Sequence, residues 1–135
     1  MDNQWAFDLE TKIFSLIKAK TYTKLKDTYP KICITNSDRS NSEPQFPTVY
    51  IHELTPTETN SDLEQNQINS VIETIQVDVT TNESKKVAKD VLTEIAKEFK
   101  KMSFSIIAMP SFDDDKKIFR ATARFRKIIN ATDKF

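Results

Sequence analysis

The sequence predicts a single α+β domain in which helices pack on one mixed or antiparallel β-sheet, in the order α-β-β-β-α-β-β. A chain of 135 residues has the length of one domain. Two segments repeat apolar residues at the helical spacing of three and four, and two others alternate apolar and polar residues as half-buried strands do. Helical and strand segments together predict layers of helix and sheet around one core.

An amphipathic helix is predicted at the start of the chain. Its apolar residues fall three or four apart and form one stripe, which consists of Trp5, Ala6, Leu9, Ile13, Leu16 and Ile17. We expect the helix to reach Leu25 and to end before Pro30, because the residue that precedes a proline disfavours the α conformation.

Two short strands are predicted next, at residues 32–35 and 48–53, each followed by a polar stretch. Residues 36–46 and 55–69 carry few apolar anchors, so we expect them to be mobile loops in the free subunit. Long loops on a small domain commonly provide contact surfaces.

The middle of the chain predicts one long strand, at residues 71–80, in which Glu73 interrupts the apolar face. A helix at residues 83–101 follows, because Val87, Val91, Ile95 and Phe99 recur every four residues.

A C-terminal hairpin is predicted, with strands at 104–109 and 117–129 and a turn at 110–116. In its second strand one face is apolar and the opposite face is basic.

Composition excludes several classes of function. The 20 basic and 20 acidic residues balance, which removes the overall positive charge that drives non-specific binding to nucleic acids. Glycine is absent, so a glycine-rich nucleotide-binding loop is excluded. No apolar run approaches the length of a membrane span, so no membrane partner is expected.

One histidine and one cysteine, His52 and Cys33, cannot build a zinc site of the Cys and His kind, and their positions do not indicate a catalytic triad. We expect His52 to be a partly exposed strand residue and Cys33 to be a buried thiol. Trp5 is expected to pack on the core, with contact to a partner protein as the alternative. The sequence therefore predicts a protein that is not an enzyme and has no cofactor, catalytic residue or metal site.

Two charged clusters are candidate interface residues. Arg120, Arg124 and Arg126 share one face of the last strand, where guanidinium groups repel one another unless water or acidic partners surround them. The adjoining turn carries three consecutive acids, Asp113, Asp114 and Asp115. The basic face is open to three interpretations: a solvated surface, pairing with acids of a neighbouring subunit, or a lining for DNA.

From about residue 44 to residue 128 the chain resembles the tail terminator, or tail completion, proteins of long-tailed bacteriophages. The resemblance rests on residues 46–51 entering a strand, the strand at 73–79, the helix that follows, Met109-Pro110, and the closing strand at 119–125. Many members have glycine before the aromatic residue that follows the second helix, where this chain has Ser103 before Phe104.

The resemblance implies a structural subunit of the virion, assembled in the bacterial cytoplasm, that forms a ring, expected to be a hexamer. Such a ring caps the tail tube, ends its polymerisation and provides the surface that joins the head or neck. The implied partners are other copies of the chain, the tail tube protein, the connector of the neck, and DNA passing through the ring. A head-completion or neck protein and a small non-enzymatic binding module are the alternatives.

Overall fold

The computed structural model describes residues 3–37, 46–59, 68–115 and 118–133, with the backbone alone for 59 and 109–115. It confirms the α+β class, with three helices and a five-stranded mixed sheet. The elements are α1 (Gln4–Phe7), α2 (Leu9–Thr28), β1 (Cys33–Thr35), β2 (Thr48–Thr59), β3 (Ser70–Thr81), α3 (Lys85–Lys101), β4 (Ser105–Asp115) and β5 (Ile118–Asn130).

The strands are arranged in the order β1-β2-β3-β5-β4, so β5 lies between β3 and β4 although it follows both in the chain. Strand β1 pairs with β2 in parallel, and every other pairing is antiparallel. The β3–β5 register runs without a shift from Ser70 opposite Asn130 to Thr81 opposite Phe119. These two strands therefore form the continuous centre of the sheet.

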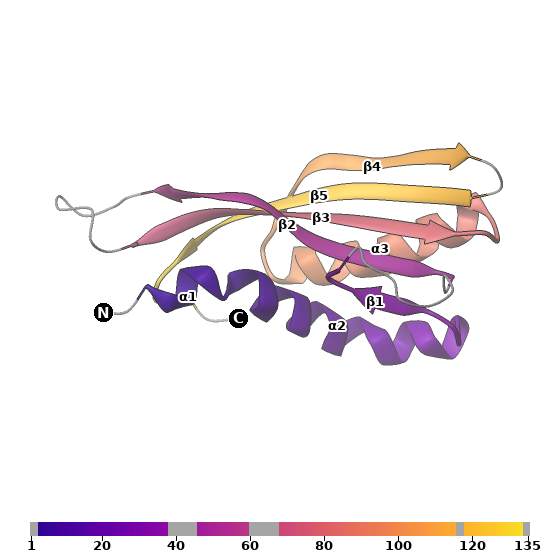
Figure 1. Ribbon diagram of the computed structural model, residues 1–135, viewed down its shortest axis with the longest axis horizontal. Helices are drawn as coiled ribbons and strands as arrows, with labels where there is room; N and C mark the ends of the chain where they lie inside the picture. The colour runs from indigo at the N-terminus through magenta and orange to yellow at the C-terminus, as the bar shows by residue number, and fades with distance from the viewer. Residues whose placement is uncertain (1–2, 38–45, 60–67, 116–117, 134–135) are drawn as a thin grey trace.

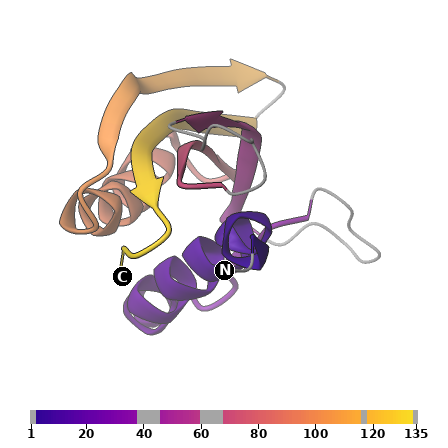
Figure 2. The same ribbon diagram turned by 90° about the vertical axis from the view of Figure 1, so that its left-hand side faces the viewer.

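Helices α2 and α3 lie on the same side of the sheet, as Figures 1 and 2 show. Alternate residues of β3 and β5 point toward the helices and are buried. The large side chains of the core include Ile13, Ile17, Ile51, Ile75, Leu92, Ile95, Phe99, Phe104, Phe125 and Ile129. Phe99 of α3 stacks on Phe125 of β5 with ring centroids 4.5 Å apart. This stack joins the helical layer to the sheet.

Both ends of α3 have specific caps. Ser84 accepts a hydrogen bond from the Val87 amide through its side chain, which satisfies a free N–H group of the first turn. At the other end Ser103 has φ of 69°, and the Phe104 amide donates to the Phe99 carbonyl. This reversed conformation with its Phe99–Phe104 ring contact is a Schellman motif.

Several element boundaries differ from the sequence-based expectation. Asp8 separates α1 from α2, so the first helical segment has a break. Strand β2 continues to Thr59, so the expected loop at 55–69 was wrong over its first residues, which pair with β3. Strand β4 extends to Asp115, so residues 110–115 are strand and not turn. The expected mobility of residues 38–45 and 60–67 lies outside the described residues.

Candidate functional site: the open face of the sheet

The open face is the surface of β2, β3 and β5 that points away from the helices. On β5 it carries the expected basic row, since Arg120, Arg124 and Arg126 occupy alternate positions and all three are exposed. The register sets these arginines opposite Thr80, Gln76 and Thr74 of β3. Alternation along a strand thus confirms that the three arginines share one face.

A hydrogen-bonded network occupies the centre of the open face. Arg124 donates from Nε to Gln76 Oε1 at 2.9 Å, and Gln76 Nε2 donates to Asp78 Oδ2 at 3.1 Å. Thr122 donates from its hydroxyl to Asp78 Oδ1 at 2.6 Å. Because each group holds the next, the network fixes the position of Arg124.

The other two arginines differ from Arg124 in their surroundings. Arg126 lies opposite Thr74 on one side and Ser105 on the other, and neither residue is charged. Arg120 lies opposite Thr80 on β3 and Asp113 on β4. Among the described side chains of β2, β3 and β5, Asp78 is the one acid on this face against three arginines, so these strands present an excess of positive charge.

The acidic cluster belongs to strand β4. Its backbone register places Asp113 opposite Arg120, Asp114 opposite Phe119 and Asp115 opposite Ile118. The fold thus brings Asp113 and Arg120 of one chain together at neighbouring positions. Neither Asp114 nor Asp115 lies opposite an arginine.

His52, Cys33 and Trp5 lie in different parts of the fold. His52 is half-buried on the open face, where its ring stacks on Tyr50 with a centroid separation of 4.2 Å. Its Nδ1 lies 3.9 Å from Asp78 Oδ2, which is too long for a hydrogen bond. Cys33 is half-buried rather than fully buried, so that expectation was wrong. Trp5 is partly buried and packs against the core, as expected.

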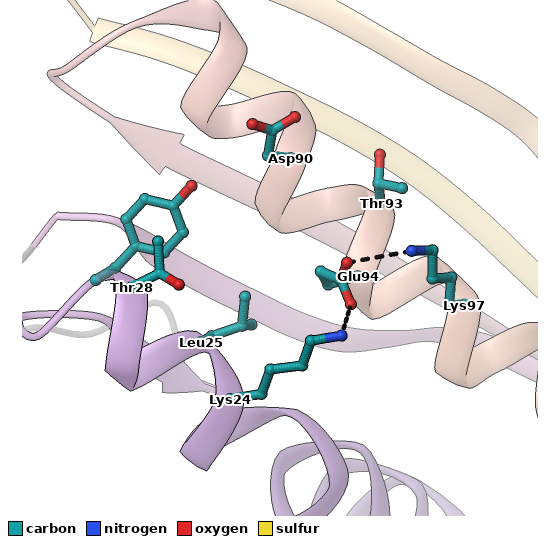
Figure 3. A pocket seen from close by; sticks show the side chains of 8 residues that line it. Lys24, Leu25, Thr28, Asp90, Thr93, Glu94 and Lys97 are labelled. Atoms are coloured by element: carbon teal, nitrogen blue, oxygen red, sulfur yellow. Dashed lines mark hydrogen bonds and ion pairs between the residues drawn. The ribbon is translucent and has the colours of Figure 1, made fainter.

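A shallow hollow of about 400 Å³ lies between α2 and α3 (Figure 3). Glu94 of α3 binds two lysines there, Lys24 of α2 at 2.7 Å and Lys97 at 3.2 Å. These hydrogen bonds lower the pKa of Glu94. The charged lining therefore links the two helices to each other.

A second cluster of acids lies on the helix-facing side of the sheet. Glu73 of β3 is completely buried, and within the described residues neither of its carboxyl oxygens accepts a hydrogen bond from an N–H or hydroxyl group. Burial, the neighbouring carboxyl of Glu53 and the charge of Glu10 raise the pKa of Glu73 to about 9. Glu73 is therefore a neutral carboxylic acid at pH 7.

Within the described ranges, no three His, Cys, Asp or Glu side chains are arranged to hold a metal ion. None of the described helices is long and apolar enough to cross a membrane.

Comparison with known proteins finds no family model that matches the chain and no significantly similar curated protein.

The sequence indicates the row of arginines but not the residues that bind Arg124. Gln76 and Asp78 alternate on the polar side of a predicted strand, yet their partners depend on the β3–β5 register, which a single sequence does not contain. The break in apolar alternation at Glu73 was visible, whereas its neighbours Glu10 and Glu53 come from distant segments.

Proposed function

We propose that this protein is a virion structural subunit that forms a closed ring, caps a phage tail tube, ends its polymerisation and offers the joining surface for the neck. The ring is expected to contain six copies. Its direct partners are then further copies of the chain, the tail tube protein and the neck connector, and DNA passes through its lumen.

The observation that supports this proposal is the exposed basic row on the open face. Arg120, Arg124 and Arg126 stand along one central strand. Asp78 is the one acid among the described side chains that β2 and β3 present on this face, and the backbone register sets Asp113 of β4 beside Arg120 alone. Exposed like charges on one strand face favour an acidic partner surface. If a neighbouring subunit places its acidic side chains against these arginines, the charge pairs fix the orientation and register of the contact.

A contact of this kind is compatible with a closed ring. When the basic row of one copy meets a different surface of the next, the interface is heterologous, and repetition gives either a ring or an open filament. A closed ring stops growth because it leaves no free interface of the same kind. This is the property that a cap on a polymerising tube requires.

The test reverses two arginines and leaves the central network intact. Arg120→Glu with Arg126→Glu keeps the bond from Arg124 to Gln76, so the fold should persist. We expect the wild-type 15.6 kDa chain to sediment at about six times its monomer mass and the double variant to sediment mainly as monomer. The defect should be largest at low salt, where screening is weakest.

The matched control reverses two exposed lysines of α3, Lys89→Glu with Lys100→Glu, which changes the net charge equally on the helical side. This control should assemble as the wild type does. If wild-type protein stays monomeric at all concentrations, the ring is excluded and the binding-module alternative is favoured.

A second test belongs to the parent phage. Deleting the protein should leave heads unjoined and tails of uncontrolled length, both visible by electron microscopy. Tails of normal length already joined to heads would exclude the terminator function. Tails of normal length without heads would instead support the neck protein.

A further inference from the structure

Glu73 lies where the sheet is irregular. The β2–β3 register runs from Glu53 opposite Ile75 to Leu54 opposite Thr74 and resumes with Thr57 opposite Ile72. Residues 55 and 56 of β2 thus form a bulge against the single residue Glu73. A buried carboxyl that accepts no hydrogen bond from a described N–H or hydroxyl group, set opposite a bulge, is an unusual feature in the middle of a sheet.

Two other carboxyl groups approach the same point. Glu53 is a diagonal neighbour of Glu73 on the helix-facing side, because its direct partner Ile75 is buried there. Glu10 comes from the first turn of α2, and its charge and that of Glu53 influence each other. Three separate elements, α2, β2 and β3, therefore each contribute one glutamate to the cluster.

The basic residue opposite Glu73 hydrogen-bonds a carbonyl oxygen of another segment. Lys127 of β5 is the cross-strand partner of Glu73, but its Nζ donates to the Met102 carbonyl at 2.9 Å and lies over the Phe104 ring. The buried face of α3 offers apolar side chains only: Ala88, Val91, Leu92, Ile95 and Phe99. An ionised Glu73 would therefore face Glu53 and Glu10 without a counter-ion hydrogen-bonded to it.

The first turn of α2, which carries Glu10, lies beside this cluster, and α1 precedes it in the chain. The Asn3 side chain accepts a hydrogen bond from the Ile68 amide at 3.0 Å, which fastens the start of α1 beside the start of β3. Figure 1 shows α1 beneath the end of the sheet where β3 begins and β5 ends. Ala6, Leu9 and Ile13 are buried along this segment.

We propose that Glu10, Glu53 and Glu73 form a proton-controlled latch that holds α1 and the first turns of α2 on the sheet while Glu73 keeps its proton and releases them when the proton is lost. The latch does not depend on the proposed ring.

The difference in the pKa of Glu73 between the closed and open states determines how strongly pH controls the latch. In the closed state the pKa of Glu73 is about 9, whereas contact with water in the open state returns it toward the ordinary 4.5. Between these values each pH unit favours the open state by about tenfold, because opening is followed by release of one proton. Detachment of the helices thus becomes more frequent as pH rises, well before the closed state itself ionises.

Amide hydrogen exchange between pH 6 and 8.5 tests the latch on the full chain. After correction for base catalysis, the opening constant at the Ile13 amide of α2 should rise about tenfold per pH unit. Ile95 in α3 serves as the internal reference, since its amide should exchange more slowly, through global unfolding. In Glu73→Gln the opening constant at Ile13 should be independent of pH.

Two further variants complete the experiment. Glu58→Gln removes an exposed carboxyl from the same strand as Glu53 and should leave the wild-type dependence unchanged. Glu53→Gln removes the neighbouring carboxylate, so the pKa of Glu73 should fall and the pH dependence should level off at a lower pH. A pH-independent opening constant at Ile13 in the wild type, or equal opening constants at Ile13 and Ile95, would overturn the latch.

Discussion

At Ser103 the chain adopts a conformation that glycine normally supplies. The residue has φ of 69° at the end of α3, and its amide donates to the Lys100 carbonyl. A side chain in this left-handed region costs roughly 1 kcal/mol because Cβ approaches the carbonyl oxygen. The turn is kept because it places Phe104 against Phe99, with ring centroids 5.1 Å apart.

Ser103→Gly should therefore stabilise the protein by about 1 kcal/mol, since glycine adopts the same φ without steric cost. Urea denaturation at constant slope measures the change. The matched variant Ser105→Gly, two residues on in exposed β4, should be destabilising because glycine weakens a strand. Equal effects at both positions would contradict the argument from backbone conformation.

Among the elements, α3 is the one that the sequence predicts most completely. Its four-residue apolar repeat placed Val91, Ile95 and Phe99 on one face, and all three are fully buried. The hydroxyl of Ser84 caps the N-terminus of this helix. Strands β2 and β4 were predicted too short, because Pro56 and Pro110 resemble loop signals in a sequence. Both strands lie toward the sides of the sheet, where pairing irregularities accommodate proline.

Truncating the buried face of α3 should be costly. Ile95→Ala removes a side chain with no exposed surface and should lower the free energy of unfolding by about 2–4 kcal/mol through lost burial and a cavity. Thr93→Ala on the exposed face of the same helix should change stability by less than about 0.5 kcal/mol. Thermal denaturation of both variants compares them, and similar melting temperatures would contradict the packing of α3 on the sheet.

For the molecule as a whole, the sequence predicted which faces of the strands are apolar or basic but not the order of the strands. No local sequence pattern indicates that β5 lies between β3 and β4, because the pairing of strands that are distant in the chain depends on the packing of the whole core. The candidate site was accordingly predicted as a row of arginines. The bond from Arg124 through Gln76 to Asp78 required the register.

The free energy of unfolding should depend on pH through the ionisation of Glu73. The folded state raises its pKa from 4.5 to about 9, so its contribution to stability is complete below pH 4.5 and is lost as pH rises toward 9. Glu73→Gln removes this loss because glutamine does not ionise. The difference in free energy of unfolding between Glu73→Gln and the wild type should therefore shift by about 3 kcal/mol in favour of the variant between pH 4 and pH 7.

Denaturation of both proteins at several pH values isolates this effect, since other groups cancel in the difference. Glu58→Gln, at an exposed position of β2, should show a difference from wild type that does not vary with pH. A constant difference between wild type and Glu73→Gln would mean that Glu73 is ionised in the folded protein.

The position of β5 has a consequence for synthesis on the ribosome. Strand β3 pairs with β5 along its full length, yet α3 and β4 are translated between the two. Until β5 emerges, a nascent chain holds β3 with one bare edge and leaves β4 without its partner. The unpaired backbone N–H and C=O groups of such an edge can form hydrogen bonds with strands of other chains. We therefore expect the protein to complete its fold only after β5 has left the exit tunnel, and ribosome-bound chains that stop before Ile118 to remain accessible to chaperones and proteases.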